Sequence, residues 1–272
     1  MWLPWTYSLP LAGLFLTIGV GARRYGRART TTAAVAFEGG RVALLYTLWQ
    51  MAGRLSVSGI ERANERGLWL WDFERSLGLP NEAALQAHVL PHDWLVQLAN
   101  LFYGGAHVPG MGIFLVWMFV RHRDEYPGWR NVLVFITFVS LVIQLIPVTP
   151  PRLIPSISMI DTAVAHGQSV YALGGSTIAG QLQAMPSLHV GWAALIGLAS
   201  WRVGDRRAKA IGSTHFVVTF LVVAVTANHY WLDGIVDMAL LIPGAAVLTR
   251  QPPNHGLVSE VGRDHLAGAV PP

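Results

Sequence analysis

The sequence has 272 residues, of which 53% are hydrophobic and only 12% are charged. Soluble domains carry about 25% charged residues, so this composition indicates an integral membrane protein. The net charge of +4 is too small to suggest a nucleic-acid partner. The chain contains no cysteine, which excludes disulfides, thiolate catalysis and cysteine-ligated metals.

Seven segments approach the roughly 20 apolar residues that a helix needs to cross the hydrocarbon core. They are residues 3–21, 32–52, 94–120, 131–147, 187–203, 210–227 and 230–248. The sequence therefore predicts an all-α, polytopic transmembrane bundle of about seven helices, with a six-helix core preceded by one N-terminal helix. We expect an N-terminal helix and basic loop over 1–31, a functional membrane domain over 32–250, and a disordered cytoplasmic tail over 251–272.

Arginine and lysine gather in three links, after the first, third and fifth predicted helices. Positively charged links favour the cytoplasmic side of a membrane. We therefore expect the N-terminus outside and the C-terminus in the cytoplasm, with an Arg-, Ala- and Gly-rich composition compatible with a bacterial plasma membrane. The basic residues are Arg23, Arg24, Arg27 and Arg29, then Arg121, Arg123 and Arg130, then Arg202, Arg206, Arg207 and Lys209.

The outward-facing link that contains residues 54–90 alternates charged residues with clustered tryptophan and leucine. This pattern is typical of an amphipathic segment that lies in the membrane interface. Two interpretations remain open at this point: a helix that screens the bundle, or a lid that helps to admit a lipid.

One histidine and one aspartate, His229 and Asp233, stand four residues apart at the start of the last apolar segment. On a helix this spacing places both side chains on one face. A carboxylate beside an imidazole fixes its tautomer and favours its cationic form, so the pair suggests a nucleophilic histidine. Ionisable groups in or near a bilayer are expensive, which makes a functional role more plausible.

Three further residues are expected at the same outer surface. Two prolines stiffen the chain before Arg152, whose guanidinium is suited to phosphate oxygens. Ser187 and His189 open the fifth predicted helix, where free backbone N–H groups favour an anion. Together with the His229 and Asp233 pair, these groups predict a phosphoryl-transfer site that uses no metal and no cofactor.

The motifs Pro-Ser-Leu-His, ending at His189, and Asn-His-Tyr-x-x-Asp, from Asn228 to Asp233, resemble the type 2 phosphatidic acid phosphatase superfamily. They are most similar to the branch of the aureobasidin-sensitive inositol phosphorylceramide synthases and their bacterial relatives. The sequence departs from the common pattern because no lysine precedes Arg152 and Val223 stands where an arginine is usual. These losses resemble the branch that contains phosphotransferases.

The resemblance implies a role for each matching residue. His229 would be the nucleophile that becomes a phosphohistidine, Asp233 its orienting carboxylate, and His189 the general acid for the leaving oxygen. The phosphate would be held by Arg152 and Ser187, with Asn228 as a possible additional donor.

Other polar residues in the predicted helices have both a structural and a functional interpretation. Asn100, Tyr103 and His107 share one face of the third segment and either form interhelical hydrogen bonds or contact the substrate headgroup. For Asp237, a hydrogen bond between helices is the favoured interpretation, and membership of a relay with Asp233 is the alternative. Glu38 and Arg41, one turn apart, indicate a structural ion pair.

The sequence favours a lipid-phosphate phosphatase or a lipid phosphotransferase. The substrate would be a phospholipid or a polyprenyl (di)phosphate within the lipid membrane, and the acceptor either water or an alcohol such as inositol or a sugar. A proton- or ion-coupled transporter that uses the buried His and Asp residues is the alternative, and a purely structural protein is a third possibility. A transporter predicts polar residues throughout the membrane depth, whereas here they gather at the outer helix ends.

Overall fold

The computed structural model describes residues 5–24, 30–55, 60–169 and 181–250. The helices in these ranges are α-helices and 3-10 helices, and the described residues form no strand. The predicted all-α class is therefore confirmed. The helices in the seven predicted segments are α1 (Trp5–Arg24), α2 (Thr30–Leu55), α5 (Asp93–Gly105), α6 (His107–Arg121), α7 (Tyr126–Ile143), α11 (Leu188–Val203), α12 (Arg206–Val225) and α13 (Trp231–Leu248). The helices in the links between them are η2 (Ile60–Arg62), α3 (Ala63–Ser76), α4 (Glu82–Val89), η3 (Pro151–Leu153), η4 (Pro155–Ile157) and α8 (Thr162–Ala165).

Each of the seven predicted segments corresponds to a helix or a helix pair. Among the described residues, three helices, α7, α12 and α13, are long and apolar enough to cross a membrane by themselves. The bent pair α5 and α6 makes a fourth candidate if the two helices form one span. The count of seven spans stays a prediction, and the tail 251–272 lies outside the described residues.

The third predicted segment is one continuous helix in our sequence interpretation, but the structure bends it by 53° between α5 and α6. Pro109 explains the break, because proline lacks an N–H and its ring crowds the carbonyl of residue 105, four positions earlier. Gly104 and Gly105 further weaken the helix just before the bend. Because of the bend, His107 lies in the first turn of a second helix, α6.

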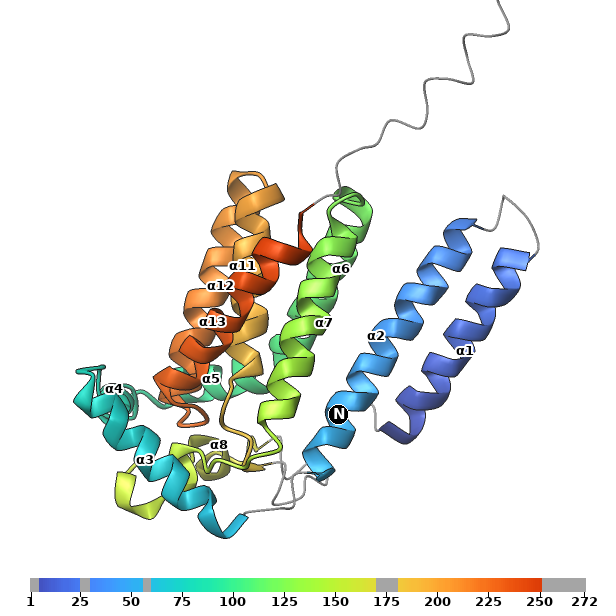
Figure 1. Ribbon diagram of the computed structural model, residues 1–272. Helices are drawn as coiled ribbons and strands as arrows, with labels where there is room; N and C mark the ends of the chain where they lie inside the picture. Colours follow the sequence, from blue (N-terminus) through green and yellow to red (C-terminus); the bar gives the residue numbers. More distant parts are fainter. Residues whose placement is uncertain (1–4, 25–29, 56–59, 170–180, 251–272) are drawn as a thin grey trace, which may run out of the picture.

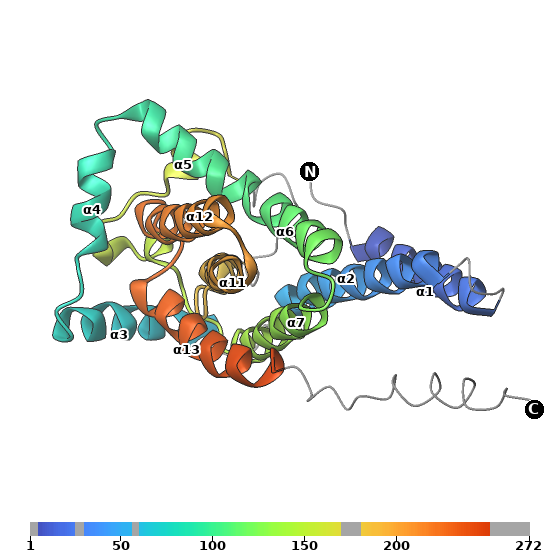
Figure 2. The same ribbon diagram turned by 90° about the horizontal axis from the view of Figure 1, so that it is seen from above.

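The core of the bundle is organised around α11, which lies among α6, α7, α12 and α13 when viewed along the helices (Figure 2). Its buried Leu195 and Ala199 pack with Trp129 and Ile136 of α7 and Leu241 of α13. The α1–α2 hairpin lies beside α7 in both views (Figures 1 and 2). Glu38 of α2 joins this hairpin to the bundle.

The Glu38 carboxylate forms an ion pair with Arg41, which confirms the predicted pair, and a second with Arg130 of α7 at 2.6 Å. The Tyr126 hydroxyl also donates to Glu38 across 3.2 Å. Glu38 therefore links α2 to α7 and also forms an ion pair within its own helix.

The two ends of the bundle differ in character. The link helices α3, α4 and α8 lie together at one end (Figure 1), and the motif-bearing starts of α11 and α13 point to that end. The opposite end holds the close of α6 and the start of α12, with the predicted basic residues Arg121 and Arg206. This segregation is what the charge pattern predicts, while the side of the membrane that each end faces stays a prediction.

The segment predicted to be amphipathic, 54–90, forms α3 and α4 within its described part. Trp69 is exposed, but Leu70 is buried and Gly67 lies against the loop that leads to Arg152. A methyl group on Gly67 would lie 2.6 Å from the Thr149 carbonyl oxygen. The segment thus packs tightly on the functional end of the bundle, and its position in the interface stays a prediction.

We expect Gly67→Ala to destabilise the protein by about 1–3 kcal/mol, because a backbone carbonyl blocks the added methyl group. Thermal unfolding of the purified protein in detergent measures the effect. Gly112→Ala is the matched control, since nothing lies within 4 Å of a methyl group there. An equal melting temperature for Gly67→Ala and wild type would contradict the packing of α3.

Candidate active site

A strained turn connects α12 to α13 and carries the predicted nucleophile. Ala227 has a φ of 55°, a left-handed conformation that costs a non-glycine residue about 1–3 kcal/mol. Its carbonyl accepts a hydrogen bond of 3.0 Å from the backbone N–H of Arg152. The turn is thus held by the loop that carries the predicted phosphate-binding arginine, and strain of this kind is common at functional sites.

The His229 ring is buried and has a defined orientation. Its Nδ1 lies 2.7 Å from the carbonyl oxygen of Ala184. Because a carbonyl can only accept, Nδ1 must carry the hydrogen, and Nε2 is left with the lone pair. Asp233 Oδ2 lies farther from Nδ1, at 3.4 Å, and accepts a hydrogen bond of 2.8 Å from the backbone N–H of Tyr230.

The protonation state of His229 differs from our expectation. Burial lowers the pKa of the imidazole to about 4, the bond to Ala184 opposes this, and the positive charge of Arg152 lowers it further. The neutral form of the ring is therefore favoured, whereas the sequence alone suggested the cation, and the contribution of Asp233 itself stays a prediction. The physical reason is that burial removes the solvation that the charged form needs. A neutral imidazole is the form that can act as a nucleophile.

The second predicted histidine lies beside the first. Ser187 caps α11 by accepting from Val190 N–H at 3.4 Å, and its own N–H donates to the Asp233 carbonyl at 3.1 Å. These bonds join the starts of α11 and α13. The ring centres of His189 and His229 are 5.7 Å apart, so both rings can reach one phosphoryl group.

Tyr103 and His107 come from the α5–α6 bend and enclose His189. The Tyr103 ring stacks on His189 with centres 4.3 Å apart, and the His107 ring centre lies 4.2 Å from it. Their predicted common face therefore does reach the site, even though the helix is bent. His107 also stacks on Trp192 at 4.8 Å.

Asn100, the third member of that face, has a different environment. It exchanges hydrogen bonds with Thr162 of α8 and donates to Gln168 at 3.1 Å. These bonds match the structural interpretation, because the polar atoms of Asn100 are used to hold α8.

Arg152 is buried in η3 at the same end of the bundle. Its Nε donates to Asp161 across 3.1 Å, an ion pair that holds the guanidinium. An isolated parallel bridge between Val148 and Gln183 fastens this loop to the segment that supplies the Ala184 carbonyl. The Arg152 loop and the His229 partner therefore form one connected unit.

Two other predicted residues have clear positions. The Asn228 amide donates to Thr226 Oγ1 at 2.9 Å, so it supports the turn. Asp237 accepts a hydrogen bond of 2.6 Å from Ser140 of α7, which confirms the predicted helix–helix bond. Within the part of the chain that the structure describes, no group of three or more His, Asp or Glu side chains is arranged to hold a metal ion.

Sequence reasoning missed four groups at this site: the Ala184 carbonyl, Asp161, Glu74 and Glu82. A backbone carbonyl leaves no sequence signal, and Asp161 stands alone nine residues after Arg152. Glu74 and Glu82 were not distinguished from the other charges of their link, although both prove to be fully buried.

A family model described as the PAP2 superfamily matches residues 68–247. This match covers well over half of the 272 residues, and the chain belongs to the PAP2 superfamily. Membership supports a phosphatase-type enzyme that is associated with membranes, and it confirms the predicted superfamily. Searches among curated proteins and among solved structures found no significant match.

The site geometry predicts different effects for the two aspartates of α13. We expect Asp233→Asn to lower the turnover of a lipid phosphate by about 100-fold or more, because the charge beside His229 is lost and the amide can misorient the ring. Asp237→Asn is the matched control one turn away and should stay within about threefold of wild type, since an amide oxygen still accepts from Ser140. Steady-state kinetics of purified variants test this, and equal effects of both substitutions would contradict it.

Proposed function

We propose that the protein is a membrane enzyme that transfers a phosphoryl group from a lipid phosphate through a phosphohistidine on His229. The observation that carries the proposal is the Nδ1–H bond from His229 to Ala184, which leaves Nε2 as the nucleophilic atom. The neutral state of the ring, with a pKa lowered to about 4, supports the same role.

In the first step, His229 Nε2 attacks phosphorus and the bond from phosphorus to the lipid oxygen breaks. The leaving oxygen takes a proton from His189, whose protonated form is favoured once an anionic phosphate lies beside it. In the second step, a hydroxyl group attacks the phosphohistidine, the P–N bond breaks, and His189 recovers its proton. The reaction requires no group beyond the residues of this chain and the two substrates.

Phosphate binding is proposed for Arg152 and for the start of α11. The guanidinium supplies a buried positive charge, and Ser187 supplies a hydroxyl at a helix N-terminus, where the helix dipole favours an anion. Such groups act mainly by stabilising the charge that develops on the phosphoryl oxygens. Because Asn228 donates to Thr226, we assign it to the turn and give it no direct phosphate contact.

The substrate class is a phospholipid or a polyprenyl (di)phosphate. The final acceptor is water in a phosphatase, or an alcohol such as inositol or a sugar in a phosphotransferase. The resemblance of the motifs to the inositol phosphorylceramide synthase branch supports transfer to an alcohol. We propose that the site faces outward, with the C-terminus in the cytoplasm, because the basic links lie at the opposite end of the bundle.

The transporter alternative is less well supported. The polar side chains of the motifs gather at one end of the bundle, whereas a relay across the membrane requires them along its depth. Membership of the PAP2 superfamily also favours an enzyme.

Purified protein should turn over at least one of dioleoyl phosphatidate, phosphatidylglycerol phosphate and undecaprenyl diphosphate in the presence of EDTA. Free phosphate reports hydrolysis, and a new phosphorylated product formed with myo-inositol reports transfer. Rapid alkali quenching with a 32P-labelled substrate should trap a label on wild type that is stable in alkali and is lost in acid.

The label and the turnover should both be absent from His229→Ala. His88→Ala is the matched control, since His88 is exposed on α4 and bonds only within its own helix. Turnover by His229→Ala at the wild-type rate, or no turnover of any of the three lipids by wild type, would overturn the proposed function.

A further inference from the structure

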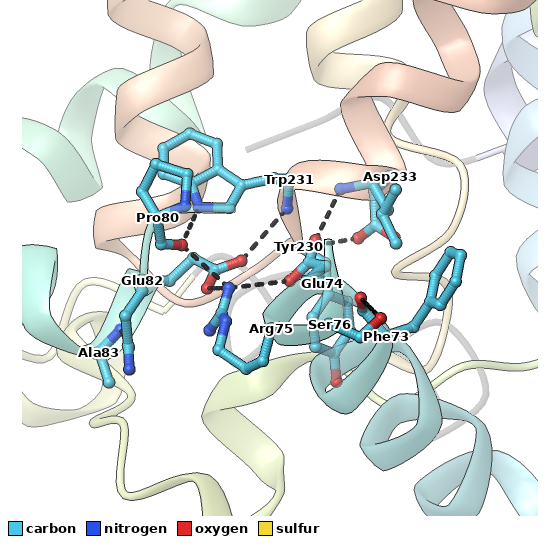
Figure 3. Close-up of polar contacts among 12 residues, drawn as sticks. Phe73, Glu74, Arg75, Ser76, Pro80, Glu82, Ala83, Tyr230, Trp231 and Asp233 are labelled. Atoms are coloured by element: carbon cyan, nitrogen blue, oxygen red, sulfur yellow. Dashed lines mark hydrogen bonds and ion pairs between the residues drawn. The ribbon is translucent and has the colours of Figure 1, made fainter. Parts of the chain in front are cut away.

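Two glutamates that belong to neither motif are completely buried beside the active site. Glu74 lies in the last turn of α3 and Glu82 begins α4, and both side chains are 0% exposed. Glutamate is almost never fully buried unless it is paired. Figure 3 shows both carboxyl groups directed at the first turn of α13, close to Asp233.

The two glutamates bond to the backbone at the start of α13. Glu74 Oε1 accepts from Leu232 N–H at 2.7 Å, and Glu82 Oε1 accepts from Trp231 N–H at 3.3 Å (Figure 3). With Asp233 accepting from Tyr230 N–H, three consecutive N–H groups each have a carboxyl partner. Helix starts leave such groups unpaired, so these acids fix the position of the turn that follows His229.

The guanidinium of Arg75 lies against both glutamates. Arg75 Nη2 lies 2.8 Å from Glu82 and 3.5 Å from Glu74, and it also donates to the Pro80 carbonyl at 2.9 Å. The Arg75 guanidinium, held over the Trp71 ring at 4.4 Å, is the cation in contact with the pair, while Asp233 adds a third carboxyl group nearby.

The carboxyl groups of Glu74 and Glu82 lie on the same guanidinium nitrogen of Arg75, and two carboxylates that share one site disfavour each other's charge. Burial raises the pKa of Glu74 to about 9, and the neighbouring Glu82 carboxyl group and the charge of Asp233 act in the same direction. The bond from Leu232 N–H opposes the rise. Glu74 is thus a neutral acid at physiological pH.

A second contact makes this turn sensitive to the α3–α4 segment. Trp231 Nε1 donates to the Pro80 carbonyl at 2.7 Å, in the loop between the two helices. Since Trp231 is two residues from His229 and Leu232 precedes Asp233, a shift of this turn moves both groups of the catalytic pair. A misplacement of about 1 Å can lower the rate of an enzyme by roughly 100-fold.

We propose that Glu74 is a positioning residue for His229: its buried carboxyl group accepts from Leu232 N–H at the start of α13 and so holds the imidazole on the Ala184 carbonyl. The inference rests on the proposed function of His229. It assigns the α3–α4 segment a role in the active site, in place of a screening helix.

Glu74→Gln and Glu74→Ala separate this role from simple packing. A glutamine amide can accept from Leu232 and donate to Glu82, so Glu74→Gln should keep kcat within about threefold of wild type at pH 7. Glu74→Ala should lower kcat by about 10–100-fold with little change in KM, because Glu74 does not touch the phosphate. The assay uses whichever of the three lipid phosphates the wild type turns over.

The pH dependence supplies the specific signature. Wild-type kcat should fall as the pH rises through about 9, when Glu74 ionises beside Glu82. Glutamine has no such proton, and Glu74→Gln should lack this fall. The melting temperature should follow the same logic: the folded state holds the proton above the ordinary pKa of 4.5, so wild-type stability declines between 4.5 and about 9, and Glu74→Gln should not show this decline.

Asp72→Asn, an exposed acid on the same helix, is the matched control and should behave as wild type. If the wild type turns over a lipid phosphate but Glu74→Gln is as impaired as Glu74→Ala, the inference is overturned and the proposed function is left intact. An alkaline fall that persists unchanged in Glu74→Gln would also overturn it. If Glu74→Ala does not fold, the pH profiles of wild type and Glu74→Gln still test the inference. Absence of wild-type turnover would instead count against the proposed function.

Discussion

The first turn of α13 depends on the pairing of its backbone N–H groups with carboxyl groups from three helices. Asp233 comes from α13 itself, while Glu74 and Glu82 come from α3 and α4. Favourable interaction of negative groups with the helix N-terminus offsets part of the cost of burying them. Because His229 directly precedes this turn, its ring is held by the same contacts that stabilise the start of the helix.

The end of the bundle that carries the site is a covered, polar compartment. Gln86 of α4 bonds to the backbone of residue 160 and to the Val225 carbonyl at the end of α12, and the Tyr230 hydroxyl donates to the Thr149 carbonyl. These bonds connect the link helices to the strained turn at Ala227. Such burial explains why His229 is neutral, and it lowers the local dielectric, which strengthens electrostatic stabilisation of a phosphoryl group.

The sequence was sufficient for the helical class, the superfamily and the grouping of His189, His229 and Asp233, because hydropathy and motif spacing are local properties. It did not predict the bend at Ala106, since glycine pairs and proline are also tolerated within membrane helices. It also could not show that Ala184 orients His229 or that Glu74 and Glu82 are buried, because these contacts join residues that are 45 to 158 positions apart. The neutral state of His229 could not be predicted for the same reason, because burial depends on the fold.

The most direct test of the account is a structure of the protein with bound vanadate, which imitates the phosphoryl group in transfer. We expect vanadium bonded to Nε2 of His229, with Nδ1 still hydrogen-bonded to the Ala184 carbonyl and the guanidinium of Arg152 against the vanadate oxygens. Vanadate bound to Nδ1, or bound away from His229, would contradict the assignment of the nucleophile.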